Sequence, residues 1–367
     1  MSRYLRRNVA AMTGYLPGEQ PRGDSIIKLN TNENPYPPSP RVLAALRKAT
    51  NGSLRLYPQP LSETLRSAAA EVYGVRPENI IAGNGSDEIL SMLLRSFVGP
   101  GDRVAFPVPT YSLYDTLIEI QDGVRAAVDY PGDFSLPESL AAQNAALTFL
   151  CNPNAPSGTL VGLQKVEQLA RRVAGILVVD EAYVDFTGSE GASSLPLIPR
   201  LPNLVVLRSF SKSFSLAGMR IGLGFAPEEL ISGMMKVKDS YNVNRLSMVA
   251  ATAALQDIPW MTRNVRRIQS SRKKLTSALE RLGYHVYPSQ ANFILAQMKG
   301  VNLKGVYEAL KRKNILVRYF EAPGLEDCLR ISVGAPQEMK ALMKELQAIG
   351  RTPPPKTLTI EPKGGER

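Results

Sequence analysis

Short apolar runs rich in β-branched residues alternate with helix-length segments over the first two thirds of this 367-residue chain. The clearest runs are GILVV at 175–179 and LVVL at 204–207, and others lie at 80–82, 103–106, 124–128 and 146–150. A continuous apolar run of this length is typical of a strand that is covered on both faces. Because strands separated by helices pair in parallel, the pattern predicts an α/β fold whose large domain has a mostly parallel sheet flanked by helices.

The pattern changes after about residue 241. A helix over roughly 260–282 ends before Gly283, a candidate C-cap, and strand candidates follow at 284–287, 292–296, 315–318 and 328–333. These segments predict a smaller α+β domain. The expected division is an N-terminal arm with part of the small domain at 1–45, a large domain at 46–245, a small C-terminal domain at 246–350 and a disordered Pro- and Gly-rich tail at 351–367. We also expect an extended connector at 32–41, NENPYPPSPR.

The composition argues against several classes of protein. Two cysteines and one histidine cannot form a disulfide framework or a metal cluster, and a Ser-His-Asp hydrolase would have to use His285 as its base. No apolar run approaches the roughly 18 residues of a membrane span, and the first residues lack the apolar core of a signal peptide. We therefore expect a cytoplasmic protein with no metal and no membrane partner.

The formal net charge of +11 raises the alternative of a nucleic-acid-binding protein. Much of this charge lies at 263–281, RNVRRIQSSRKKLTSALER, in a helical pattern that is not interleaved with aromatic residues. A solvated helix face, or an enzyme that handles anionic substrates, explains the charge better. No nucleic-acid partner is predicted.

Polar motifs follow several of the predicted strands. They are GNGSDE at 83–88, CNPNAPSG at 151–158, DEAY at 180–183 and RSFSKSFSLAGMR at 208–220. Ligands of open parallel sheets bind beyond the carboxyl ends of the strands, so these motifs are expected to lie together. Gly85, Ser86 and Asp87 precede a helix and could cradle a phosphate, although simple capping of that helix is the alternative.

The motifs at 180–183 and 208–220 suggest a covalently held cofactor. A carboxylate that leaves a buried strand needs a partner, and without a metal Asp180 would meet a basic side chain or a protonated ring nitrogen. Ser209, Ser211 and Arg220 suit a phosphate, and Lys212 among cations is expected to have a lowered pKa and to attack a carbonyl. Pyridoxal phosphate is a cofactor that requires this set.

The motifs PTYSLY, NPNAPSG, DEAY and SFSKSFSLAGMRIG, in this order, resemble those of the fold-type-I pyridoxal-phosphate aminotransferases. LNTNENPYPP, RLYP, GNGSDE, YNVNRLS, ANFIL and VRYFEAPGLEDCLRISVG more narrowly resemble the histidinol-phosphate aminotransferases, and the resemblance covers nearly the whole chain. It implies a homodimer that binds pyridoxal 5'-phosphate. The implied reaction, a step of histidine biosynthesis, interconverts L-histidinol phosphate plus 2-oxoglutarate and imidazole-acetol phosphate plus L-glutamate by ping-pong transamination.

The resemblance also assigns roles to residues. Lys212 would hold the cofactor and move a proton, Asp180 would pair with the ring nitrogen and Tyr183 would contact the ring hydroxyl, so these three are the predicted catalytic residues. The predicted cofactor-binding residues are Tyr57 (reaching into the neighbouring subunit), Gly85, Ser86, Asp87, Tyr111, Asn154, Asp180, Tyr183, Ser209, Ser211, Lys212 and Arg220. The predicted substrate-binding residues are Tyr15, Asn292, Arg318 and Arg330.

One position departs from the family pattern. The usual NPNNPTG has an asparagine where this chain has Ala155, and Asn154 is the nearest substitute for the contact to the ring hydroxyl. Similar sequences also occur among broader aromatic amino-acid aminotransferases and threonine-phosphate decarboxylases, so both remain alternatives to the histidinol-phosphate reaction.

Overall fold

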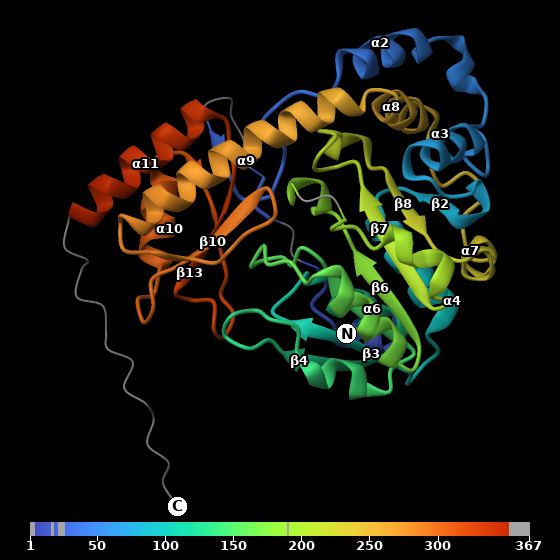
Figure 1. Ribbon diagram of the computed structural model, residues 1–367, viewed down its shortest axis with the longest axis horizontal. Helices are drawn as coiled ribbons and strands as arrows, with labels where there is room; N and C mark the ends of the chain where they lie inside the picture. Colours follow the sequence, from blue (N-terminus) through green and yellow to red (C-terminus); the bar gives the residue numbers. More distant parts are fainter. Residues whose placement is uncertain (1–3, 16–17, 21–25, 189–190, 352–367) are drawn as a thin grey trace, which may run out of the picture.

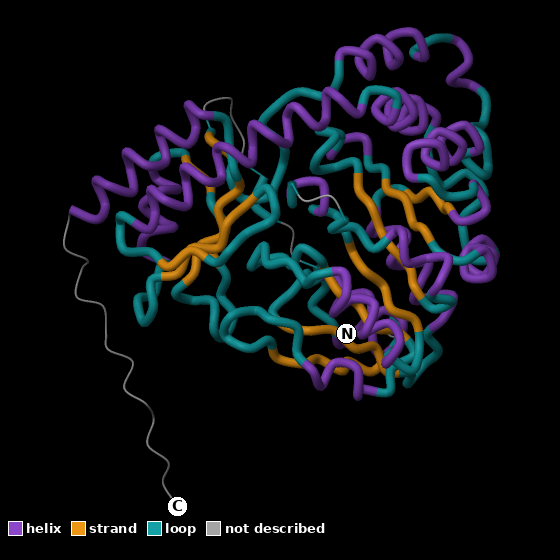
Figure 2. Tube along the Cα trace, viewed as in Figure 1, coloured by secondary structure: helices purple, strands orange, loops and turns teal. Residues whose placement is uncertain are grey.

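The computed structural model describes residues 4–15, 18–20, 26–188 and 191–351, and it contains two main sheets flanked by helices (Figure 1). Parts of the predicted arm at 1–45 and, apart from Arg351, the predicted tail at 351–367 lie outside the described residues. Figure 2 shows the two sheets as separate strand groups, with one long helix running past both.

The larger sheet has seven strands in the order β2-β8-β7-β6-β5-β3-β4. The strands from β7 to β4 pair in parallel, which confirms the predicted mostly parallel sheet, whereas β8 is antiparallel to both β2 and β7. The strands are β2 (Ile80–Gly83), β3 (Arg103–Val108), β4 (Val124–Asp129), β5 (Leu147–Cys151), β6 (Ile176–Asp180), β7 (Leu204–Ser209) and β8 (Gly222–Phe225).

Both faces of this sheet are covered, as the continuous apolar runs predict. In β6, Leu177 and Val179 pack in the core on one face and Val178 packs in the core on the other. The first face is covered by α2 (Pro40–Ala49), α3 (Glu63–Tyr73), α6 (Leu163–Arg172) and α8 (Arg245–Leu255). The second is covered by α4 (Ser86–Phe97), α5 (Leu113–Gln121), α7 (Glu228–Met235) and part of α9 (Ile258–Glu280).

The smaller sheet is antiparallel, with the order β12-β13-β10-β9, and a separate parallel pair joins β1 to β11. Helices α9, α10 (Lys304–Arg312) and α11 (Pro336–Arg351) accompany it, while the short α1 (Arg7–Ala11) lies near α5. The strands are β1 (Ile27–Lys28), β9 (His285–Val286), β10 (Phe293–Gln297), β11 (Ile315–Leu316), β12 (Arg318–Tyr319) and β13 (Cys328–Ser332).

Two local predictions need correction. The single strand expected at 315–318 is wrong, because Ile315 and Leu316 pair with the N-terminal arm while Arg318 pairs with β13 in the other sheet. The connector expected at 32–41 is shorter, because Pro40 opens helix α2 after Ser39, whose hydroxyl accepts a hydrogen bond from the Arg41 N–H. The division of the chain into domains at 45, 245 and 350 stays a prediction.

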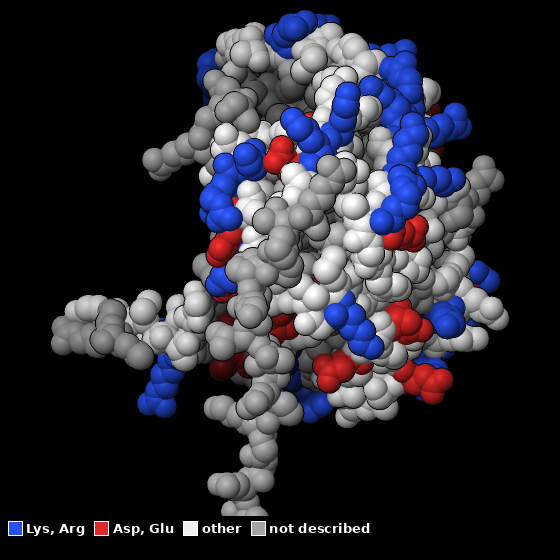
Figure 3. Space-filling model, turned by 90° about the vertical axis from the view of Figure 1, so that its left-hand side faces the viewer, with Lys and Arg blue, Asp and Glu red and all other residues white. Residues whose placement is uncertain are grey.

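The basic segment predicted near 263–281 lies mainly in α9. Its exposed cations are Arg263, Arg266, Arg267, Lys273, Lys274 and Arg281, and Figure 3 shows Lys and Arg side chains gathered in the upper part of one face of the molecule. Arg272 is an exception to the solvated face, because it is buried and donates to the main-chain oxygens of Phe186 and Ala291. Among the described residues, no helix is long and apolar enough to cross a membrane.

Candidate active site

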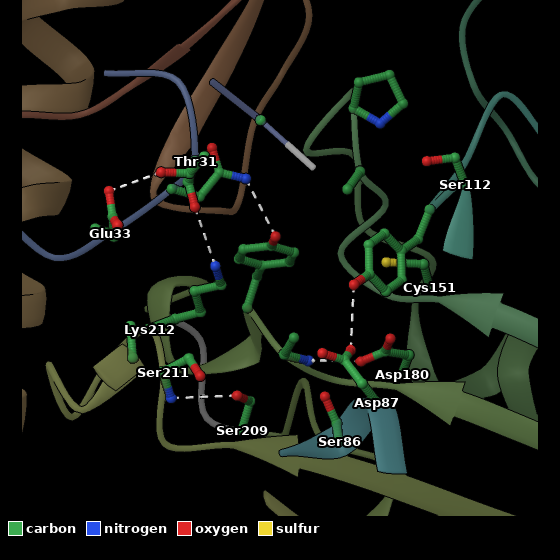
Figure 4. A pocket seen from close by; sticks show the side chains of 18 of the residues that line it. Thr31, Glu33, Ser86, Asp87, Ser112, Cys151, Asp180, Ser209, Ser211 and Lys212 are labelled. Carbon is green, nitrogen blue, oxygen red and sulfur yellow. Dashed lines mark hydrogen bonds between the residues drawn. The ribbon is translucent and has the colours of Figure 1, made fainter. Parts of the chain in front are cut away.

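The carboxyl ends of the large sheet's strands meet at one edge. β5, β6 and β7 run in parallel, and β2 runs in the same direction because β8 is antiparallel to both β2 and β7. A cavity of about 420 Å³ opens at this edge, and the small sheet and the N-terminal arm close its other side (Figure 4). The predicted site residues that line it are Tyr15, Ser86, Asp87, Tyr111, Asp180, Tyr183, Ser209, Ser211, Lys212, Arg220, Arg318 and Arg330.

Lys212 follows β7 and its amine donates a hydrogen bond to the main-chain oxygen of Thr31, at 3.2 Å. The amine also lies 5.8 Å from the centre of the Tyr183 ring. Burial, together with the nearby guanidinium of Arg330, lowers the pKa of Lys212 from 10.5 to about 8. A substantial fraction of this lysine is therefore neutral near physiological pH, which is the state that attacks a carbonyl carbon.

Asp180 is the last residue of β6 and is almost fully buried. One carboxylate oxygen accepts from the hydroxyl of Tyr114 at 3.0 Å, and the other accepts from the Ala182 N–H at 3.2 Å. Burial raises the pKa of Asp180 to about 6, against the opposing effect of the Tyr114 hydrogen bond. No ion pair to a described cation compensates the charge, so this carboxylate can accept a cationic partner from the cavity.

Tyr183, the last residue of DEAY, lines the cavity, and its hydroxyl accepts a hydrogen bond from the Asn32 side chain at 3.1 Å. Burial raises the pKa of Tyr183, so the phenol stays protonated and can donate. Its ring packs edge-on against Phe293 at 5.0 Å between ring centres. The hydroxyl is therefore held between the large sheet and the arm.

A set of groups suited to a phosphate gathers where α4 begins. Ser86 and Asp87 are the first residues of the helix, whose leading N–H groups have no intrahelical partner. Ser209, Ser211 and Arg220 line the same end of the cavity, with an Arg220 nitrogen 3.4 Å from the Ser211 hydroxyl. The Asp87 carboxylate accepts from Arg220 at 2.9 Å and from the Tyr111 hydroxyl at 3.1 Å, so it ties the guanidinium to the aromatic wall.

Two glycines allow this close approach. Gly85 has φ +88, and an added Cβ would lie 2.8 Å from the Arg220 guanidinium. A Cβ on Gly222 would lie 2.4 Å from the Ser86 nitrogen. Arg220 itself has φ +50, an uncommon conformation for a residue with a side chain. A side chain at Gly222 would push the helix start away from the strand, and one at Gly85 would displace the Arg220 guanidinium, so both small residues shape this end of the cavity.

Two arginines of the small sheet form the opposite wall. Arg330 lies on β13, donates to the Asn30 main-chain oxygen at 2.9 Å and leaves its buried Nε without a partner. Its guanidinium lies over the Phe293 and Phe320 rings, and Arg318 shares the Phe320 ring. Burial lowers the pKa of Arg330. No described carboxylate pairs with either arginine, so this wall presents uncompensated positive charge to an anion.

Comparison with known proteins identifies the family. The model of the class I and II aminotransferases matches residues 24–346. The chain belongs to the class I and II aminotransferases. It is 44% identical to histidinol-phosphate aminotransferase 1 of Trichormus variabilis over 353 residues, covering 96% of this chain and all of that protein. It is 46% identical to histidinol-phosphate aminotransferase of Citrifermentans bemidjiense, covering 94% and 98%.

A solved structure agrees with this assignment to the aminotransferases. Histidinol-phosphate aminotransferase of Sinorhizobium meliloti, in complex with pyridoxal-5'-phosphate, superimposes with a TM-score of 0.89. Its sequence is 26% identical, and the match covers 96% of this chain and 98% of that one. The fold is thus the fold-type-I aminotransferase fold that the sequence motifs predict.

Four predicted site residues of this aminotransferase lie outside the cavity lining: Tyr57, Gly85, Asn154 and Asn292. The side chain of Asn154 is buried among Thr110, Pro109 and Ser157, while the neighbouring Ala155 lines the cavity. Asn292 donates to the main-chain oxygen of Asn32. Tyr57 is 77% exposed and stacks on Tyr241, with 4.4 Å between ring centres. Their roles stay predictions.

Sequence reasoning missed two residues that contact the predicted catalytic groups. Tyr114 reaches Asp180, and its ring stacks on Phe149 with 4.5 Å between centres. Asn32 reaches Tyr183 from a segment that reads as a connector. The second tyrosine of PTYSLY was a usable signal for Tyr114, because a tyrosine on a buried helix face needs a hydrogen-bond partner. No local signal marked Asn32, whose partner is 151 residues away.

Proposed function

We propose that this aminotransferase interconverts L-histidinol phosphate plus 2-oxoglutarate and imidazole-acetol phosphate plus L-glutamate. The observation that carries the proposal is the position of Lys212, a lysine of lowered pKa that lies in one cavity with a buried carboxylate, Asp180, and with Arg330, a half-buried guanidinium that no described carboxylate pairs with. The relatives at 44% and 46% identity, both histidinol-phosphate aminotransferases, support this choice of substrate.

The residues of the cavity fit pyridoxal 5'-phosphate. Asp180 lacks a cationic partner among the described side chains and suits a protonated ring nitrogen. The helix start at Ser86, together with Ser209, Ser211 and Arg220, suits the phosphate. When bound, the cofactor supplies a carbonyl that takes up the amino group and a ring that withdraws electrons from the neighbouring carbon. Lys212 would hold it covalently, Tyr111 would lie along the ring and Tyr183 would donate to the ring oxygen.

Lys212 also acts as the proton carrier in this proposal. Its amine lies inside the cavity, and its pKa of about 8 lets it accept and release a proton near neutral pH. The Thr31 carbonyl accepts one of its hydrogens and so fixes the position of the nitrogen. A free lysine of pKa 10.5 would be almost wholly protonated and could not accept a proton from a substrate carbon.

The arginine wall would select the substrates. Arg330 and Arg318 together offer two positive charges to a phosphate or a carboxylate, which matches histidinol phosphate in one half-reaction and glutamate in the other. Tyr15 lies edge-on to Tyr111, 6.2 Å between ring centres, and would flank the substrate side chain. Both substrates must use this wall in turn, because the two halves of the reaction share one cavity.

The proposal includes a homodimer and a cytoplasmic location. Tyr57 and Tyr241 form an exposed aromatic stack beside Leu54 and Leu56, and such a large exposed apolar group is typical of a surface that another chain covers. In the dimer, Tyr57 would reach the neighbouring subunit's cofactor site. This arrangement would give each cavity a residue that its own chain cannot supply.

Turnover of three amino donors tests the choice of substrate. The purified protein, loaded with pyridoxal phosphate, is given L-histidinol phosphate, L-phenylalanine or L-tyrosine with 2-oxoglutarate, and kcat/KM is measured for each donor. A clear preference for histidinol phosphate is expected. A preference for the aromatic amino acids would replace the proposal with a broader aromatic aminotransferase. Release of carbon dioxide from phosphothreonine, without transamination of histidinol phosphate, would replace it with a decarboxylase.

A further inference from the structure

The Tyr183 hydroxyl is connected through Asn32 to the small sheet. Asn32 is buried, and its side-chain amide donates to the Tyr183 oxygen at 3.1 Å. The Ser332 hydroxyl on β13 contacts Asn32 twice, accepting from its main-chain N–H at 2.9 Å and donating to its Oδ1 at 2.9 Å. Asn292 donates to the Asn32 carbonyl, which fixes the arm at this point.

Each hydrogen bond of this network has a defined donor and acceptor. A main-chain N–H can only donate, so the Ser332 oxygen must accept from Asn32, and its one proton goes to the Asn32 Oδ1. The amide of Asn32 has its Nδ2 toward Tyr183, and the phenol oxygen accepts there. The phenol's own proton has no acceptor among the described residues, and Tyr183 lines the cavity.

We propose that Asn32 and Ser332 are positioning residues that keep the proton of the Tyr183 hydroxyl directed into the cavity, toward the ring oxygen of the cofactor. This inference rests on the proposed function, since it presumes that pyridoxal phosphate occupies the cavity. It gives the arm and β13 a role in the cofactor's electronics, although neither belongs to the large sheet.

The departure at Ala155 makes this network more important to the chain. Ala155 lines the cavity with a methyl group, and the amide of Asn154 is engaged with Thr110 and Ser157. Neither residue presents a side-chain donor to the cavity. The orientation of the Tyr183 proton then decides whether the ring oxygen receives a hydrogen bond from this side of the cavity.

Asn32→Asp tests the inference, because aspartate has the same shape but cannot donate. The carboxylate would accept the Tyr183 proton and withdraw it from the cavity. A hydrogen bond donated to the ring oxygen stabilises the deprotonated form of the bound chromophore, so its loss raises the pH midpoint of the visible absorbance change by about one unit. The measurement is a spectrophotometric pH titration of the protein loaded with pyridoxal phosphate.

A double-mutant cycle separates the proton from the new charge. In a Tyr183→Phe background the hydroxyl is absent, so Asn32→Asp should shift the midpoint much less than in the unaltered chain. Equal shifts in the two backgrounds would mean that only the negative charge acts, and would overturn the inference, as would no shift in either. Ser332→Ala frees the Asn32 amide to turn, so it should raise the pH midpoint by less than Asn32→Asp does. Ser332→Ala tests the inference if the Asn32→Asp variant does not fold.

A matched control is Asn203→Asp, which also removes an amide donor. The Asn203 amide donates to the main-chain oxygens of Ala170 and Gly175, remote from the cavity, so this change should lower the melting temperature and leave the midpoint unchanged. If the unaltered protein binds no pyridoxal phosphate, the proposed function itself fails. If it binds the cofactor and the variants titrate like it, only the positioning role fails.

Discussion

The amine of Lys212 lies 3.2 Å from the main-chain oxygen of Thr31, a residue 181 positions earlier in the chain. The arm therefore holds this amine in place at the edge of the large sheet. The same surroundings, a buried wall and the Arg330 guanidinium, lower the pKa of this amine to about 8. The chemistry of the lysine is thus set jointly by the arm, the large sheet and the small sheet.

The first prediction concerns the pH dependence of cofactor uptake. Only the neutral amine attacks the cofactor's carbonyl, so the rate at which cofactor-free protein binds pyridoxal phosphate covalently should rise with pH and level off above about pH 8. Stopped-flow absorbance measures this rate, and Lys212→Ala supplies the baseline. A rate that keeps rising to pH 10 would show that the pKa of Lys212 is not lowered.

The second prediction concerns Asp180→Asn in the cofactor-free protein. Burial raises the pKa of Asp180 from 3.8 to about 6, so the native state binds the proton more tightly than the unfolded chain does. The group's contribution to stability is therefore full below pH 3.8 and is lost as the pH rises through 6. Asparagine avoids this loss, so the variant should be more stable at pH 7 by up to about 3 kcal/mol, the equivalent of a shift of about two pKa units.

Chemical denaturation at pH 7 and at pH 4 measures this difference. The advantage of Asp180→Asn should shrink toward zero at pH 4, while its transaminase activity should be lost at both values. A variant that is less stable than the unaltered protein at pH 7 would show that the carboxylate has a cationic partner in the empty cavity.

The third prediction concerns the arginine wall. Arg330→Gln removes a half-buried charge that has no carboxylate partner among the described residues, so it should not lower the melting temperature. It should lower kcat/KM for both L-histidinol phosphate and L-glutamate by about 100-fold, because a charge-assisted contact to the substrate is lost. Arg330→Lys should lower kcat/KM by an intermediate factor, since lysine keeps the positive charge but lacks the guanidinium's paired N–H donors.

A suitable control for Arg330→Gln is Arg171→Gln, which breaks an exposed ion pair with Glu167 on α6. Arg171→Gln should leave both the melting temperature and kcat/KM equal to those of the unaltered protein within error. Equal losses of kcat/KM in the two variants would indicate that Arg330 acts through the overall charge of the protein and does not contact the substrate.

The fourth prediction tests whether Tyr57 serves a neighbouring subunit. Tyr57→Ala and Lys212→Ala should each be nearly inactive as purified dimers. When the two are unfolded together and refolded, half the dimers should be mixed, and each mixed dimer should hold one cavity with both residues intact. The mixture should regain about a quarter of the activity of the unaltered protein. No recovery would place Tyr57 outside the shared site.

Sequence patterns predicted the parallel strands of the large sheet better than its antiparallel strand β8. The runs at 175–179 and 204–207 are apolar throughout and became β6 and β7. β8 was missed because GLGF is four residues long, half of them glycine, and its antiparallel pairing with β2 and β7 brings together segments far apart in the chain. The strand expected at 315–318 split for a similar reason, since its first half pairs with the arm.

The candidate site shows the same division between local and distant signals. Lys212, Asp180 and Tyr183 stand in motifs whose chemistry can be read directly, and all three line the cavity. Asn32 could not be found in this way, because its importance comes from Ser332, 300 residues later. A polar residue in a Pro-rich connector has no distinguishing periodicity, so only the folded chain reveals its partners.

The central claim is that Lys212 holds pyridoxal phosphate and passes an amino group from histidinol phosphate to 2-oxoglutarate. The most direct test is the visible absorbance spectrum of the purified, cofactor-loaded protein before and after L-histidinol phosphate is added, with Lys212→Ala alongside. The unaltered protein should show a band that histidinol phosphate removes and 2-oxoglutarate restores, and the variant should show neither change. A colourless protein, or a Lys212→Ala variant that responds in the same way, would contradict the claim.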